Sequence, residues 1–76
     1  MLFMIIIQKF LDETPTVKAL YEYNTLDEAK SALYSTMASS MANDNIKSVL
    51  CEIINDIGGV VKTEMWERPV IGNPIA

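Results

Sequence analysis

The chain contains no histidine and a single cysteine, Cys51, among its 76 residues. Without histidine it lacks the usual general base near neutral pH and the commonest metal ligand. One cysteine excludes an internal disulfide bond and is typical of a protein from a reducing compartment. The composition therefore disfavours an enzyme, predicts neither a metal site nor a cofactor, and indicates a cytoplasmic protein.

Positive charge is also scarce, with six Lys and Arg against ten Asp and Glu and a net charge of −4. A protein that follows a phosphate backbone needs a basic stripe, so the balance disfavours nucleic-acid binding. The apolar run Met1–Ile7 is too short to cross a bilayer, and it has no cationic region or cleavage site typical of an export signal. We expect no membrane segment and interpret this run as a buried strand.

The pattern predicts four strands. In some of these segments apolar and polar residues alternate, and in others the apolar residues are nearly continuous, as in a strand buried on both faces. A turn with a proline, Asp12–Pro15, joins the first two, and Asp56–Gly59 joins the last two. Such short connections predict two hairpins. The expected strands are Leu2–Leu11, Thr16–Tyr23, Ile46–Asn55 and Val60–Arg68.

The segment between the hairpins has a clear helix signal. Thr25 and Glu28 form a capping box, in which a threonine hydroxyl accepts from the amide three residues on. Asn43–Asn45 is a suitable stop, since asparagine tolerates a left-handed cap. An apolar stripe of three- and four-residue spacing follows the cap and comprises Leu26, Ala29, Leu33, Met37 and Met41.

This order of elements predicts an α+β domain of ββαββ type. It has a four-stranded antiparallel sheet with one helix packed on one face. Residues 1–69 form the single domain, and residues 70–76 form an apolar tail that contains proline. We expect no second domain.

One helix covers one face of such a sheet, yet the first and third strands are apolar on both faces. Half of all residues are hydrophobic, which is more than a core of this size requires. The second face is therefore expected to bind another chain, most simply a second copy, because two-fold dimers are the commonest assembly. The residues predicted for this oligomer face are Ile5, Ile6 and Ile7.

Aromatic and basic residues near the end of the chain suggest a second contact surface. Trp66 shares a predicted strand face with Lys62 and Arg68, and aromatic residues beside cations are enriched in interfaces and stack on ligands. Tyr21 and Tyr34 are expected to join them in an interface or ligand site. The alternative is that these aromatic residues pack at the edge of the core. For Cys51 we expect a buried small hydrophobic residue, because no cationic neighbour activates it.

The helix is expected to carry small residues on a smooth outer face with almost no charge after Lys30. These residues are Ser31, Ser35, Thr36, Ser39 and Ser40 together with Ala32, Ala38 and Ala42. Exposed helices usually carry Glu and Lys pairs there. A smooth face of this kind permits helix-to-helix contact with another chain, or it is merely an exposed polar face.

Several stretches resemble small uncharacterised ββαββ proteins of gut Firmicutes and their prophages. The resemblance lies in Gln8–Phe10, in Ala19–Tyr23 leading into Thr25–Ala29, and in Trp66–Pro69, within a span of roughly residues 4–69. It implies a phage or mobile-element setting in the cytoplasm of a bacterial host cell. It implies no activity.

Two hypotheses follow. The first is a small acidic binding module that acts as a homo-oligomer and grips a host protein, for example as an inhibitor of a host defence protein. The second is a protein that binds or sequesters a small nucleotide-type ligand in a pocket between subunits, lined by the tyrosines, Trp66 and the two cations.

Overall fold

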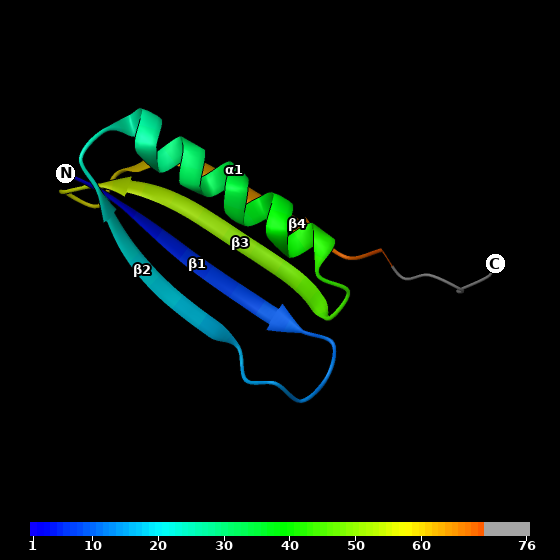
Figure 1. Cartoon of the computed structure of the whole chain (residues 1–76). Helices are drawn as coiled ribbons and strands as arrows, with labels where there is room; N and C mark the ends of the chain where they lie inside the picture. Colours follow the sequence, from blue (N-terminus) through cyan, green and yellow to red (C-terminus); the bar gives the residue numbers. More distant parts are fainter. Residues whose placement is uncertain (70–76) are drawn as a thin grey trace.

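Two β-hairpins meet along their inner strands, and one helix connects them across one side of the sheet (Figure 1). The computed structural model describes residues 1–69, so the predicted tail lies outside the described residues. All neighbouring strands are antiparallel, in the order β2-β1-β3-β4. The predicted ββαββ architecture is confirmed. Its elements are β1 (Leu2–Phe10), β2 (Val17–Tyr23), α1 (Leu26–Ala42), β3 (Ile46–Asn55) and β4 (Val60–Glu67).

The centre of the sheet is the pairing of β1 with β3, which extends from Leu2 opposite Asn55 to Phe10 opposite Ile46. A register shift after Lys9 leaves Lys47 as an extra residue on β3. Because of this bulge, Ile46 lies across from Phe10 and is buried. Simple alternation along the predicted strand Ile46–Asn55 places Ile46 on the same face as Leu50 and Ile54, and the bulge turns Ile46 to the opposite face.

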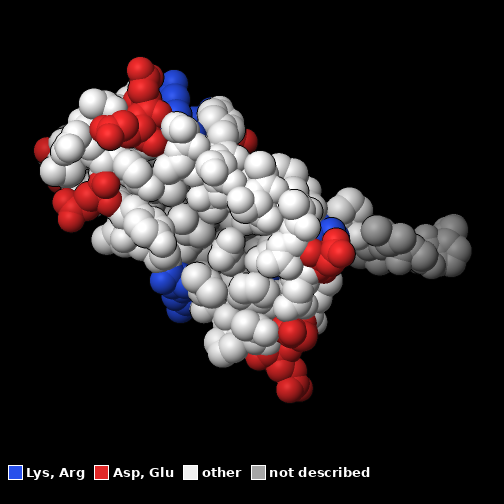
Figure 2. All heavy atoms as spheres, viewed as in Figure 1, with Lys and Arg blue, Asp and Glu red and all other residues white. Residues whose placement is uncertain are grey.

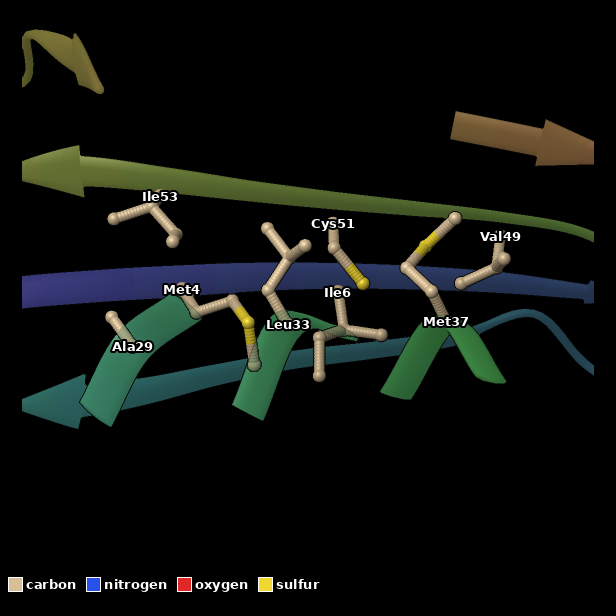
Figure 3. Close-up of a cluster of buried hydrophobic side chains, with 8 residues drawn as sticks. All are labelled: Met4, Ile6, Ala29, Leu33, Met37, Val49, Cys51 and Ile53. Atoms are coloured by element: carbon tan, nitrogen blue, oxygen red, sulfur yellow. The ribbon is translucent and has the colours of Figure 1, made fainter. Parts of the chain in front are cut away.

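The hydrophobic core lies between α1 and the two central strands (Figure 3). Alternate residues of β1 and β3 point toward the helix, while the helix contributes side chains one turn apart. Trp66 and Ala19, on the two edge strands, pack against the rim of this cluster. The buried cluster comprises Met4, Ile6, Ala29, Leu33, Met37, Val49, Cys51 and Ile53.

The helix begins at the predicted cap. The backbone N–H of Glu28 donates to the Thr25 hydroxyl oxygen at 3.2 Å. The same hydroxyl donates to the Glu28 carboxylate at 3.1 Å, so the two side chains bond each other directly. Asp27 and Glu28 also place negative charge in the first turn, where the helix dipole favours it.

The buried stripe of α1 differs from the predicted one at both ends, and at its start Leu26 is 37% exposed. Ser40 is buried and Met41 is exposed, because Ser40 follows Ala29 by close to three full turns while Met41 lies about 100° further around the axis. The Ser40 hydroxyl donates to the Thr36 carbonyl at 2.8 Å and accepts from the Gln8 side-chain amide at 3.0 Å. These bonds satisfy a polar side chain inside the core.

The helix ends at Asn43, which has an extended backbone (φ −91°, ψ 111°) in place of the expected left-handed one. Its N–H donates to the Ser40 carbonyl at 3.2 Å, and its side chain accepts from the Asn45 N–H at 2.9 Å. The second hairpin turns as predicted, with Gly58 at positive φ (85°).

The cap at Thr25 supports a first test. We expect Thr25→Ala to lower the free energy of unfolding by about 1 kcal/mol, because the Glu28 amide loses its acceptor. Thr25→Ser keeps the hydroxyl and serves as the matched control. Urea denaturation followed by circular dichroism measures both. An alanine variant with the same midpoint and slope as the unmodified protein would show that the cap does not stabilise α1.

Candidate functional site

The face of the sheet turned away from α1 is the one that the helix leaves uncovered. We call it the open face. Its residues alternate with those that point to the helix, and they lie opposite one another across the four strands. The open face comprises Phe3, Ile5, Ile7 and Lys9 on β1, Lys18, Leu20 and Glu22 on β2, Ser48, Leu50, Glu52 and Ile54 on β3, and Val60, Thr63, Met65 and Glu67 on β4, where a register shift places Val60 opposite Ile54.

Apolar side chains run across this face from one edge strand to the other. Leu20 lies opposite Ile5, and Leu50 lies between Ile7 and Met65. At the two edges Leu20 is 62% exposed and Met65 is 74% exposed. Large apolar side chains gathered on one face at such exposure usually mark a contact surface.

The predicted oligomer residues divide between the two sides of the sheet. Ile5 and Ile7 lie on the open face and are half-buried. Ile6 lies in the core under the helix with 6% of its surface exposed, so its assignment to the oligomer face is corrected. The side chains of neighbouring strand residues point to opposite faces, so all three isoleucines cannot share one surface.

A groove of about 520 Å³ lies over one end of the open face. It follows two rows of paired residues, one of which runs from Ile7 through Leu50 to Met65. The other row places Ser48 between Lys9 and Glu67. The groove is therefore apolar along one row and polar along the next.

Charges on the open face are unevenly placed. Two lysines lie at one end of this face: Lys9 near the end of β1, and Lys18 on β2 opposite Ile7. Glu22, also on β2, lies at the other end, opposite Phe3 near the start of β1. Glu52 lies inside the apolar region opposite Ile5, and its carboxylate accepts from the Thr63 hydroxyl at 3.1 Å.

The side of the molecule that carries α1 has a different pattern (Figure 2). Acidic side chains gather where the helix begins and near the β1–β2 turn, whereas the surface over the middle of the helix is nearly without charge. Asp27 and Glu28 account for acidic groups in the first helical turn. Of the predicted smooth outer face, Ser31, Ser35 and Ser39 are exposed. The assignment of Ser40 to this face is corrected, because Ser40 is buried against the sheet.

The predicted aromatic and basic group is only partly brought together. The Lys62 ammonium lies 5.5 Å from the centre of the Tyr34 ring, and Arg68 lies 4.8 Å from that of Trp66. Both pairs are on the helix side of β4. Tyr21 lies on β2, at the opposite edge of the sheet, where it pairs with Met4 of β1. It therefore does not join the other residues of the group.

Both cations of this group already have partners within the chain. Lys62 forms an ion pair with Glu64 at 3.1 Å, and a hydrogen bond with Tyr34 is the main cause of its raised pKa. Arg68 donates from Nε to the Ile46 carbonyl at 2.8 Å and from Nη2 to the Asn43 carbonyl at 2.7 Å. Arg68 thereby fastens the end of β4 to the start of β3.

Groups with reactive potential have structural roles in this fold. Cys51 lies fully inside the core, and burial raises the pKa of its thiol, which keeps it protonated and unreactive. The Asp12 carboxylate accepts from the Thr14 N–H at 2.8 Å and the Asn45 side chain at 3.0 Å. These bonds, that of Thr14 first, lower its pKa and hold the β1–β2 turn.

Within residues 1–69, no group of three or more metal-ligating side chains is gathered. In the same range, α1 falls short of the length and apolar character needed to span a bilayer.

No family model matches the chain, and neither a curated protein nor a solved structure matches it.

Arg68 supports a second test. We expect Arg68→Ala to lower the free energy of unfolding by about 1–2 kcal/mol, because two carbonyl groups lose a charged donor. The emission of Trp66, the single tryptophan, should change because its ring loses the stacked guanidinium. Lys30→Ala, which removes a cation from the exposed helix surface, is the control. Unchanged stability and emission in the Arg68 variant would contradict this role.

Proposed function

We propose that the protein is a non-catalytic, protein-binding module that holds its partner on the open face of its sheet. The observation that carries this proposal is the exposure of Leu20 and Met65 at the two edges of a face whose centre is formed by Ile5, Ile7 and Leu50. A four-stranded face about seven residues long has an area of about 450 Å² from strand spacing and rise. Covering such a surface removes apolar groups from water.

The energy available is sufficient for binding. About half of the residues on this face are apolar, so at ~25 cal/mol for each Å² the burial of its apolar part and of an equal area on the partner contributes on the order of 10 kcal/mol before the costs of docking and ordering. The surrounding strands are already ordered by the core on the other side, so few backbone groups need to be immobilised. A rigid face loses less entropy on binding than a flexible loop.

The resemblance to prophage proteins supports a setting for this module. In such a setting the proteins that it meets are those of a bacterial host, defence proteins included. The net charge of −4 disfavours nucleic acid as a partner. On this basis, inhibition of a host protein is the role that we propose for the module beyond binding itself.

The alternative, a nucleotide-type ligand between subunits, has less support. Stacking aromatics and free cations were its basis, yet Lys62 is bound to Glu64 and Arg68 to backbone carbonyl groups. Tyr21 lies at the other edge of the sheet. A phosphate would have to displace these intramolecular partners.

Methionine oxidation tests whether the open face is covered, without knowledge of the partner. Met65 is 74% exposed on the open face, and Met41 is 45% exposed on the helix, so the uncovered chain oxidises faster at Met65. In cells that express the protein from its own gene, we expect brief peroxide treatment to oxidise Met65 more slowly than Met41. Buried Met4 and Met37 report any general unfolding. Peptide mass spectrometry measures all four positions.

Ile5→Glu places a charge in the middle of the open face and is the matched variant. Its Met65 should regain the faster oxidation, while Met4 and Met37 stay protected. If Met65 of the unmodified protein oxidises faster than Met41 in those cells, the open face is not a binding surface and the proposal fails.

A further inference from the structure

We propose that the occupant of the open face is a second copy of this chain, stacked sheet to sheet with the strands of the two copies running in opposite directions. This inference rests on the proposed function and names the partner of that same surface. It follows from the size of the face, from the distribution of its charges and from its single unfavourable group.

The size of the open face suits a small dimer. Two faces of about 450 Å² together approach the roughly 1,000 Å² at which protein interfaces become specific. In each copy the helix covers one face of the sheet, and the other face carries apolar residues that a second sheet can cover. Two such sheets pack about 10 Å apart with nearly aligned strands, as in β-sandwiches.

The positions of the charged side chains favour one relative orientation of the two copies. Lys18 and Lys9 lie at one end of the open face, and Glu22 lies at the other end. A two-fold axis perpendicular to the strands lays the lysine end of each copy over the Glu22 end of its partner. It also lays β2 over β2, so that Lys18 of one copy is beside Glu22 of the other. An axis parallel to the strands keeps the lysines of both copies at the same end.

The contact is then the same in both directions, as a closed dimer requires. Glu67 is the exception at the lysine end, and it lies on β4, three strands away from Lys18. Within one chain, Lys18 and Glu22 are four residues apart on one strand, a separation of about 13 Å. An attraction between these two side chains is therefore a contact between copies.

Glu52 is the group that opposes stacking. It lies in one row with Ile5 and Leu20, and because Leu20 is midway between Lys18 and Glu22, this row lies on the two-fold axis and the Glu52 carboxylates of the two copies face each other. Its carboxylate lies among apolar side chains and accepts from Thr63 alone among the described hydrogen bonds. Covering it removes water from a charge, which costs free energy unless a cation compensates. Glu52→Gln keeps the shape and the acceptor oxygen and should therefore tighten the dimer by about threefold to tenfold. A hetero-partner with a cation at this point would instead bind the Gln variant more weakly.

A charge exchange tests the orientation in the purified full chain. Lys18→Glu alone brings a new carboxylate beside that of Glu22 in the other copy, and Glu22→Lys alone brings a new ammonium beside that of Lys18. Sedimentation should show each variant dissociating about tenfold more readily than the unmodified dimer. An equimolar mixture of the two variants should re-form dimers within about threefold of the original affinity, since every contact between copies again joins opposite charges.

Ile5→Glu should dissociate the dimer, and Ala38→Glu on the exposed helix surface should not. The inference is overturned if the mixture fails to recover, if Glu52→Gln weakens the dimer, or if the helix variant dissociates it. It is also overturned if the purified unmodified chain sediments as a monomer at high micromolar concentration. In that last case, slow oxidation of Met65 in cells would leave the binding module standing with a different partner. Fast oxidation there would remove both proposals.

Discussion

The antiparallel ladder between β1 and β3 is the interaction on which the rest of this molecule depends. It joins strands that are distant in the sequence and extends from Leu2 opposite Asn55 to Phe10 opposite Ile46. In both strands, apolar side chains point to either side of the sheet. Their pairing therefore creates two apolar faces. The two hairpins add β2 and β4 at the edges, because a short turn requires each of these strands to pair with its neighbour in the sequence.

The single helix α1 covers only one of these two faces. The side chains of Leu33 and Met37 fill the space over Met4, Cys51 and neighbouring residues, and they complete a core of a size expected for such a short chain. The cations that the sequence pattern assigned to a ligand site are used to fasten this side, as Arg68 shows by bonding the carbonyl group of Ile46. Side chains capable of ligand binding therefore stabilise the fold, and α1 leaves the open face uncovered.

The order of elements and the helix start were predictable from sequence because local signals determine them, such as the hydroxyl of Thr25 before Glu28. The outward direction of Ile5 and the inward direction of Ile6 were not, since an all-apolar strand has no alternation to orient it. Burial of Ser40 depended on a distant partner, Gln8. Separation of Tyr21 from Trp66 followed from strand order, which pattern alone does not give.

The central claim is that the open faces of two copies lie against each other in solution. Isotope-filtered NMR on an equal mixture of labelled and unlabelled chains measures this directly, because it records only contacts between copies. Stacked sheets predict intermolecular nuclear Overhauser effects between the methyl groups of Ile5, Ile7 or Leu20 and open-face side chains of the other copy. Effects confined to helix residues such as Ala38, or none at concentrations where the chain is assembled, would contradict the claim.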